Sequence, residues 1–272
     1  MVTRRHALQA LGAGALLACH ERSSPPGFRA ESKPLVIDGN PSIDGRGARV
    51  HRLFPQTAGQ HLDPFVLLDD FRVAPPAGFP EHPHRGFEAF TYMLEGRFHH
   101  RDNLGNDSVV SAGGTQRFTS GRGARHSEMP ADQRINRGLQ LWINLPRKLK
   151  TIEPEYAAVH DREIPEHAVG DVIVRTVVGA GSPVVLRTPV RYLDLTVPTG
   201  ARFEDETPAG WRGIAYLADG HAQIGGVDLR PGQAAILSAG AFEIRAQREA
   251  RLVYLAGQPH GEPILHRGPY VD

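Results

Sequence analysis

Two short stretches of the chain carry side chains that suit a metal ion. His82 and His84 are separated by one proline, and His126 and Glu128 repeat the same i, i+2 spacing further along. In an extended strand, residues i and i+2 point to the same face, so each pair would present its two side chains together. Three imidazoles and one carboxylate form a donor set for a mononuclear transition metal, and they suit Fe, Mn, Ni, Cu or Zn without choosing among them.

The number of donors bears on what such a site could do. Four protein ligands would leave one or two coordination positions open, and reactive sites keep such positions for water, O₂ or substrate. Strand periodicity does not establish that the two pairs meet, so surface histidines beside turns remain the alternative. The chain has one cysteine, Cys19, which excludes an iron–sulfur cluster held by four thiolates.

The elements that must position these residues are predicted to be strands. Apolar runs of four to eight residues alternate or are β-branched, and Gly, Pro, Asn and Asp interrupt them. The predicted strands are Val50–Phe54, Phe65–Leu68, Ala89–Leu94, Val109–Ser111, Leu139–Leu145, Val172–Val178, Tyr192–Val197, Ile214–Leu217, Ala234–Leu237, Phe242–Arg245 and Leu252–Leu255. No stretch sustains an apolar 3.6-residue period for three turns, so an all-β sandwich or barrel is expected.

A weak internal repeat divides this pattern in two. The segment YMLEG at residues 92–96 parallels YLADG at residues 216–220, and each precedes a short strand, a Gly-containing turn and another apolar strand. We therefore predict two similar β-barrels in tandem, one over residues 35–165 and the other over residues 166–272.

The N-terminus has the features of an export signal. Residues 1–18 combine a positively charged head that includes Thr3-Arg4-Arg5 with a short apolar run, and small residues follow. They resemble a twin-arginine signal, and Leu16–Cys19 resembles a lipobox in which Cys19 would be lipidated. The expected location is the periplasm, free or anchored to a membrane; a plain Sec-type or uncleaved leader with an incidental cysteine is the alternative. Residues 19–34 are polar and predict a flexible tether.

Composition narrows the class of partner. The chain of 272 residues carries 31 basic and 30 acidic side chains for a net charge of +1, and 40% of it is hydrophobic. It has no basic stripe with interleaved aromatic residues, so a nucleic-acid partner is not indicated. The oligomeric state is left open.

Longer motifs resemble a known family. HPHRGFEAFTYMLEGRFHHRD, GNDSVV, GGTQRFTSGRGARHSE and GLQLWINLP are similar to the pirin family, strongly from Val50 to Pro146 and more weakly to the end of the chain. The resemblance implies a bicupin, which is two tandem β-barrels of the cupin superfamily. It also implies one metal, usually iron, held in the N-terminal barrel by His82, His84, His126 and Glu128.

The second barrel lacks the matching donors. When the two Tyr-x-x-acidic-Gly segments are aligned, the His-x-His positions fall on Glu206 and Pro208, and the later pair falls near Glu243–Arg245. His221 lies in a turn without a partner. One metal per chain is therefore expected.

The resemblance implies two kinds of function. Some pirin-like proteins have quercetin 2,3-dioxygenase activity, with a flavonol-like aromatic substrate and O₂. In that case His82, His84 and His126 would hold the metal, and Glu128 would be a ligand that also accepts the substrate hydroxyl proton as a general base. The alternative is a non-catalytic, metal-dependent redox-sensing or binding protein.

Neighbouring residues admit structural interpretations. Arg85 is expected to pair with Glu88 rather than to orient a substrate anion. Glu88 could instead accept a hydrogen bond from a ligand histidine or be a solvated strand residue. His99 and His100 are expected to be exposed strand residues rather than ligands.

Glycines and aromatic residues near the motifs are expected to have structural roles. Gly121 and Gly123 should allow the backbone turn that delivers His126. Trp142 is expected in the core. Packing is also the expected role of three phenylalanines that could otherwise wall a flat substrate: Phe87, Phe90 and Phe118.

Overall fold

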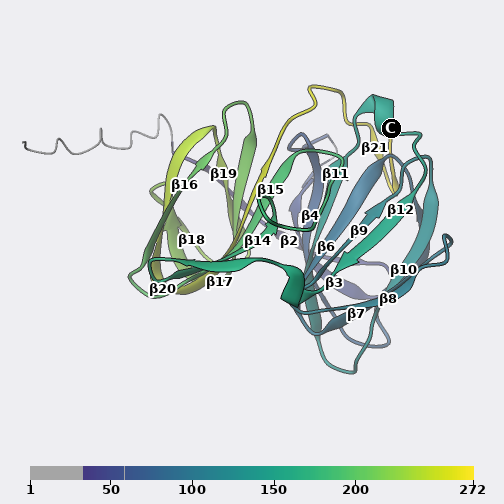
Figure 1. Ribbon diagram of the computed structural model, residues 1–272, viewed down its shortest axis with the longest axis horizontal. Helices are drawn as coiled ribbons and strands as arrows, with labels where there is room; N and C mark the ends of the chain where they lie inside the picture. Colours follow the sequence, from purple (N-terminus) through teal and green to yellow (C-terminus); the bar gives the residue numbers. More distant parts are fainter. Residues whose placement is uncertain (1–32, 58) are drawn as a thin grey trace, which may run out of the picture.

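The computed structural model describes residues 33–57 and 59–272. The predicted signal peptide, Cys19 and almost all of the predicted tether lie outside the described residues. Two β-barrels stand side by side, with the N-terminal barrel on the right in Figure 1 and the C-terminal barrel on the left. The all-β, two-barrel architecture predicted from the sequence is confirmed.

Two sheets build the N-terminal barrel. The larger has the order β12-β9-β6-β11-β4-β3-β2, and the smaller has the order β5-β10-β7-β8. The strands are β2 (Asn40–Asp44), β3 (Ala48–Phe54), β4 (Phe65–Val73), β5 (Phe79–His84), β6 (Phe87–Glu95), β7 (Arg97–Asp102), β8 (Asp107–Ser111), β9 (Thr115–Thr119), β10 (Ala124–Pro130), β11 (Asn136–Asn144) and β12 (Glu155–Val159).

One continuous sheet builds the C-terminal barrel. Its main path is β1-β19-β17-β20-β15-β14-β13, with β16 paired to β20 and β18 paired to β17. The strands are β1 (Leu35–Asp38), β13 (Glu166–Val169), β14 (Val172–Val178), β15 (Val190–Val197), β16 (Arg202–Thr207), β17 (Arg212–Ile224), β18 (Val227–Leu229), β19 (Gln233–Leu237) and β20 (Gly240–Gly257). Each segment predicted to be a strand lies wholly or largely in a strand of the structure, and the last two predicted strands are parts of β20.

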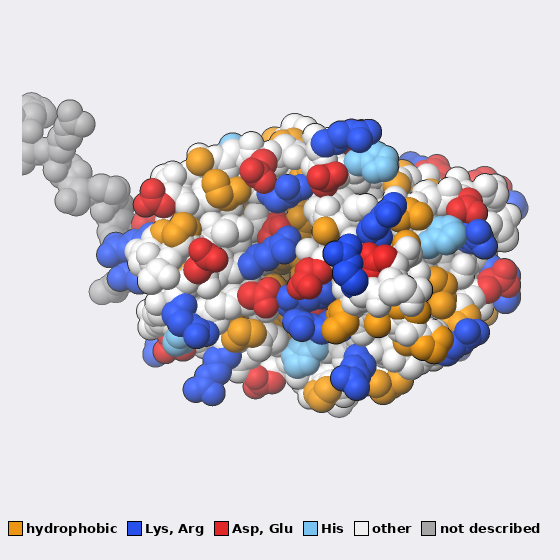
Figure 2. Space-filling model, turned by 90° about the horizontal axis from the view of Figure 1, so that it is seen from below, with side chains coloured by type: hydrophobic (Ala, Val, Ile, Leu, Met, Phe, Trp, Pro, Cys, Tyr) orange, Lys and Arg blue, Asp and Glu red, His pale blue; other side chains and the backbone are white. Residues whose placement is uncertain are grey.

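Helix is scarce. In the described part of the chain, helical structure is limited to two 3₁₀ turns, η1 (Arg147–Leu149) and η2 (Asp161–Glu163). None of the helices described is long and apolar enough to cross a membrane. On the face shown in Figure 2, basic and acidic side chains alternate over both barrels rather than gather by sign.

The interface between the barrels uses the repeated tyrosines. Tyr92 of β6 donates a 2.7 Å hydrogen bond to Asp194 of β15, and Tyr216 of β17 donates one of the same length to Asp70 of β4. Each carboxylate also accepts hydrogen bonds from an arginine of its own barrel, Arg251 for Asp194 and Arg137 for Asp70. The YMLEG and YLADG segments therefore mark equivalent positions at a pseudo-symmetric interface, packed with apolar side chains from both barrels.

Both described ends of the chain cross to the opposite barrel. Strand β1, within the range assigned to the first barrel, pairs antiparallel with β19 of the second. The C-terminal strands β21 (His266–Arg267) and β22 (Tyr270–Val271) reach back to the N-terminal barrel, where Tyr270 bridges to Arg85. Gly86 lets this segment approach closely, because a Cβ there would lie 1.9 Å from the Val271 carbonyl oxygen. The C-terminal segment thus becomes part of the wall beside His84.

Candidate metal centre

Strand pairing brings the two sequence motifs together. Strands β5 and β10 are antiparallel neighbours, with His82 opposite His126 and His84 opposite Ala124. His82 and His84 share one face of β5, as their i, i+2 spacing predicts. Gly121 and Gly123 precede β10 with φ angles of +45° and +132°, which glycine adopts at little cost. They therefore allow the turn that delivers His126, as expected from the sequence.

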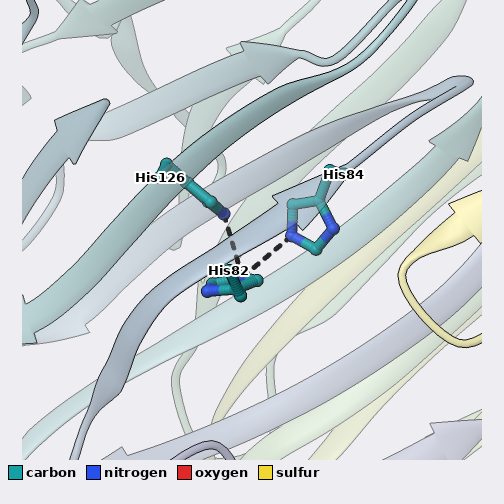
Figure 3. A group of neighbouring side chains, drawn as sticks. All are labelled: His82, His84 and His126. Carbon is teal, nitrogen blue, oxygen red and sulfur yellow. Dashed lines mark hydrogen bonds between the residues drawn. The ribbon is translucent and has the colours of Figure 1, made fainter. Parts of the chain in front are cut away.

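Three imidazole nitrogens converge between these strands. The Nε2 atoms of His82 and His84 are 3.0 Å apart, and those of His82 and His126 are 3.1 Å apart. Figure 3 shows the rings pointing toward one another from neighbouring strands. Two nitrogens bound at about 2.1 Å and at right angles to each other would lie about 3.0 Å apart. The spacing therefore fits a single metal ion.

Burial keeps these imidazoles neutral. His84 and His126 are 3% and 1% exposed. Desolvation lowers the pKa of His82, lowers that of His84 to about 3, and lowers that of His126 well below the ordinary value. The neighbouring imidazoles add to the shift at His84 and His126, because each disfavours a positive charge on the next. Neutral imidazole is the form that binds a metal.

The hydrogen bonds made by Nδ1 of His82 and of His84 show that Nε2 of each ring carries a lone pair. His82 Nδ1 donates to the Pro80 carbonyl at 2.8 Å, and His84 Nδ1 donates to the Pro269 carbonyl at 3.4 Å. A neutral ring that carries its proton on Nδ1 has a lone pair on Nε2. The Nε2 lone pairs of His82 and His84 consequently face each other, an arrangement that a cation between them would stabilise. On this observation the residues present fit a metal ion.

Glu128 lies close to this group but belongs to a second one. The alignment of β10 with β5 shifts between His126 and Glu128, so that Glu128 stands opposite Phe79. Its ligand oxygen lies within 4.8 Å of ligand nitrogens of His100 and His126, whereas the three-histidine group does not include it. The structure thus gathers His82, His84 and His126 and leaves Glu128 beside them. The ligand role of all four residues stays a prediction.

The carboxyl of Glu128 is buried in a polar setting. Thr91 donates a 3.1 Å hydrogen bond to its Oε1, and Gln116 donates another. Burial raises the pKa of Glu128 to about 7, and the two hydrogen bonds oppose that rise only in part. This side chain can therefore hold or release a proton near neutral pH.

A cavity of about 870 Å³ opens beside the three histidines. Its wall includes His82, His84 and Glu128, while the fully buried His126 lies behind it. Apolar and aromatic side chains line much of the rest, with Gln140 and the ion-paired Arg52 and Asp69 among the polar groups. A volume of this size is typical of a small-molecule site.

The aromatic residues that line the cavity differ in part from those considered in the sequence. Trp142 is only half-buried, lines the cavity, and lies with its ring centroid 4.1 Å from Phe87 and 4.9 Å from His84. It packs against the apolar cluster that contains Phe87, as expected, but it also lines the cavity, a role indicated by its i, i+2 spacing with Gln140, which lines the same cavity. The three phenylalanines considered in the sequence are buried in the packing, and Phe71 and Phe79 are the ones that line the cavity.

The interpretation of two charged residues is corrected. Arg85 does not pair with Glu88; it forms a two-pronged ion pair with Asp272, at 2.8 Å and 2.9 Å from Nη2. Glu88 is fully buried, so it is not a solvated strand residue, and both of its oxygens accept hydrogen bonds from residues other than histidine. It accepts hydrogen bonds from the Thr119 hydroxyl and from the backbone N–H of Arg187, which follows β14. Residues far away in sequence decided both partners.

His100 also departs from expectation, whereas His99 does not. His99 is partly exposed and pairs with Asp107. His100 is completely buried, its ring stacks on Tyr156 at 4.0 Å, and it contacts His126. The sequence signal for His100 was its i, i+2 spacing with Asp102, which repeats the pattern of the two recognised motifs.

Apolar residues occupy the equivalent strands of the second barrel. There β16 pairs with β20, and Phe203 stands opposite Ile244. Both residues are buried in the apolar core of that barrel together with Phe242. Glu206, aligned with a ligand position, is exposed. Among the residues described, the groups able to hold a metal all lie in the first barrel.

Comparison with known proteins adds independent findings. The family model described as pirin matches residues 47–143, and the pirin C-terminal cupin domain matches residues 192–272. A pirin-like protein 2 from Arabidopsis thaliana is 39% identical, with 88% of this chain and 80% of that protein covered. Pirin from Homo sapiens is 38% identical, with 87% and 86% covered.

A solved structure shares the fold. Quercetin 2,3-dioxygenase from Acinetobacter baumannii aligns with a TM-score of 0.81 and 29% identity, over 88% of this chain and 91% of that one. Its two-barrel architecture therefore extends over nearly all of the described residues.

Proposed function

The chain belongs to the pirin family of the cupin superfamily, and we propose that it is a metal-dependent dioxygenase of quercetin 2,3-dioxygenase type. The proposed substrates are a flavonol-like aromatic compound and O₂. One observation carries the proposal: three neutral imidazole nitrogens converge beside a cavity large enough for such a compound, and two of the three histidines line it. The similarity to an enzyme of that name supports the same assignment.

The proposed ligands are His82, His84 and His126, with Glu128 as the fourth. Iron is the metal we propose, and Mn, Ni, Cu or Zn would suit the same donors. When bound, the metal would supply a Lewis acid for a substrate hydroxyl and a redox centre for O₂. The hydrogen bonds from the outer nitrogens of His82 and His84 would hold the two rings in place.

Glu128 is the proposed acceptor of the substrate proton. It lines the cavity, so a hydroxyl group entering beside His82 and His84 can reach it. Its carboxyl is buried beside the cavity, and a carboxylate held within hydrogen-bond reach of a substrate hydroxyl can accept the proton of that hydroxyl. Thr91 and Gln116 keep the carboxyl oriented through their hydrogen bonds.

The cavity wall favours a flat substrate with polar substituents. Trp142, Phe71 and Phe79 supply aromatic faces, and aromatic rings pack well on one another. Gln140 and Arg52 offer hydrogen-bond donors to ring substituents.

The test is oxygen consumption by purified, iron-loaded protein. With a set of flavonols and catechols, we expect one O₂ consumed for each substrate molecule lost, because a dioxygenase places both oxygen atoms in its product. Protein that contains iron but consumes no O₂ with any of these compounds would contradict the enzyme assignment. The non-catalytic redox-sensing or binding function would then take its place, tested by partner binding to the oxidised and reduced forms.

A matched pair of variants distinguishes a specific role of Glu128 in turnover from a general loss of activity caused by a substitution in this barrel. Glu128→Gln removes the proton acceptor while keeping the size of the side chain, and turnover should fall about 10²- to 10⁴-fold. His99→Ala changes an imidazole on the adjacent strand that pairs outward with Asp107, and turnover should stay at the wild-type level. Equal losses in the two variants would contradict a specific role for Glu128.

Export remains part of the proposal. The features of residues 1–18 support a cleaved signal, and the position of Cys19 supports a lipid anchor. The N-terminus and mass of the mature protein test both: a chain that still begins at Met1 would contradict cleavage.

A further inference from the structure

The three imidazoles differ in the hydrogen-bond partner of Nδ1, the nitrogen that points away from the other two rings. The Nδ1 atoms of His82 and His84 face backbone carbonyls, which can only accept a hydrogen bond. The Nδ1 of His126 faces Nδ1 of His100 at 3.5 Å. An imidazole nitrogen can either donate or accept, so the proton position on His126 depends on that of His100.

Asp102 fixes the proton position on His100. The Nε2 of His100 is 3.0 Å from Oδ2 of Asp102, and both side chains are 0% exposed. A carboxylate accepts only, so Nε2 of His100 carries the proton and its Nδ1 has the lone pair. That lone pair can accept the Nδ1 proton of His126. The Nε2 of His126 is then left unprotonated and faces His82 at 3.1 Å.

Several hydrogen bonds fix the orientation of the Asp102 carboxylate. Its Oδ1 accepts hydrogen bonds from the backbone N–H groups of Leu104 at 2.9 Å and Asn106 at 3.0 Å. Its Oδ2 accepts the side-chain N–H of Asn106 at 2.8 Å as well as that of His100. The carboxylate therefore cannot rotate without giving up several hydrogen bonds, and the stacking of His100 on Tyr156 fixes the plane of the imidazole.

We propose that Asp102 and His100 are positioning residues that hold His126 in the tautomer able to bind the metal. The relay runs from the Asp102 carboxylate through both nitrogens of His100 to Nδ1 of His126, and it ends at the Nε2 lone pair. The inference rests on the metal site of the proposed function. It assigns a task to two buried residues that are not ligands of the three-histidine group.

The decisive variant is Asp102→Asn. The side-chain oxygen must stay where two backbone N–H groups need an acceptor, so the amide N–H₂ replaces Oδ2 and donates to Nε2 of His100. The side-chain amide of Asn106, which donates to Oδ2 in the wild-type protein, must then turn its oxygen toward that N–H₂. The proton of His100 then moves to its Nδ1. Nδ1 of His126 must accept a hydrogen bond from that N–H, so His126 carries its own proton on Nε2. A protonated Nε2 has no lone pair for a metal.

The first readout is the tautomer of His126 in metal-free protein, measured by ¹⁵N NMR of labelled imidazoles. Wild-type protein should carry the proton on Nδ1, and Asp102→Asn should carry it on Nε2. The second readout is titration with Co(II), whose visible spectrum reports its ligands. The affinity of Asp102→Asn for Co(II) should be about 10- to 100-fold weaker, the range found for groups that orient a ligand.

A second variant and a control guard against misfolding. His100→Phe keeps a ring to stack on Tyr156 but removes both nitrogens, so His126 should lose its single tautomer and bind Co(II) more weakly. His99→Ala, the neighbouring residue of β7 on the outer face, should change neither readout.

The outcomes separate this inference from the proposed function. An unchanged His126 tautomer in Asp102→Asn would overturn the relay, and a changed tautomer with unchanged Co(II) affinity would overturn its positioning role. If wild-type protein bound no metal, the proposed function would fail. The relay would still be supported if the His126 proton lay on Nδ1 in wild-type protein and moved to Nε2 in Asp102→Asn.

Discussion

The two barrels share a strand plan but fill it with opposite chemistry. Strands β5 and β10 of the first barrel enclose His82, His84 and His126 beside a cavity. Their counterparts β16 and the start of β20 bring Phe203, Phe242 and Ile244 into a packed apolar core. The difference shows that the fold itself does not require a polar interior, and burying polar imidazoles costs free energy that the apolar second barrel does not spend.

The interface between the barrels shows the reverse. Tyr92 and Tyr216 make equivalent hydrogen bonds to carboxylates of the opposite barrel. Here the two halves carry the same chemistry, since each tyrosine donates to an aspartate that also accepts hydrogen bonds from an arginine of its own barrel. The symmetry of the repeat is therefore retained where the barrels meet and lost where the first barrel gathers its buried histidines.

The largest expected effect is the loss of metal from the first barrel. Wild-type protein expressed with iron should contain about one metal ion per chain, since three convergent neutral imidazoles form one site. The double variant His82→Ala/His126→Ala should contain none. Metal analysis of both proteins tests this, and equal metal contents would sink the ligand assignment. The matched control is His221→Ala in the second barrel, which should retain the wild-type content.

The second barrel should instead respond through stability. Phe242 is 5% exposed and packs against Tyr254 with ring centroids 4.8 Å apart. Phe242→Ala should lower the free energy of unfolding by about 3 to 5 kcal/mol, because it removes apolar contacts and leaves a cavity. Denaturant titration measures the change, and metal content per folded chain should not move. Metal loss in this variant would show that the two barrels are not independent in function.

Acid should affect the first barrel through its buried imidazoles. Burial lowers the pKa of His84 to about 3 from its ordinary value of 6.5. Below about pH 6.5 the unfolded chain binds a proton there that the folded chain does not, so stability falls with falling pH until about pH 3. For metal-free protein, the stability of His84→Gln relative to wild type should rise by about 2 kcal/mol between pH 7 and pH 5.

That difference isolates His84 from groups that act in the other direction. The pKa of Glu128 is raised to about 7, so its contribution to stability is complete below about pH 4.5 and is lost as pH rises through 7. Glu128 is present in both proteins and largely cancels. A stability difference that did not change with pH would contradict a His84 kept neutral by burial.

The smallest effect should be the same in both barrels. Tyr92→Phe and Tyr216→Phe each remove one hydrogen bond to a carboxylate that an arginine still partners. Each should lower the free energy of unfolding by about 1.5 kcal/mol. Denaturant midpoints measured side by side test this symmetry, and a severalfold larger effect at one tyrosine would show that the interface is not equivalent on its two sides.

The sequence by itself determined the β architecture, the two-fold repeat and the residue types of the site. Short alternating apolar runs predict strands because a strand exposes alternate faces. The same rule places His82 beside His84. The sequence also predicts that the second barrel lacks the matching histidines, although only the structure shows that Phe203, Phe242 and Ile244 fill its interior.

Only the tertiary structure decided which residues surround the site. Arg85 finds Asp272 across 187 positions of the chain, and the C-terminal segment supplies the carbonyl that holds His84. A shift in strand alignment moves Glu128 into the group with His100, although its spacing from His126 matches the first motif. Local periodicity tells which way a side chain points along its own strand, whereas burial and hydrogen-bond partners depend on the strands that pack against it.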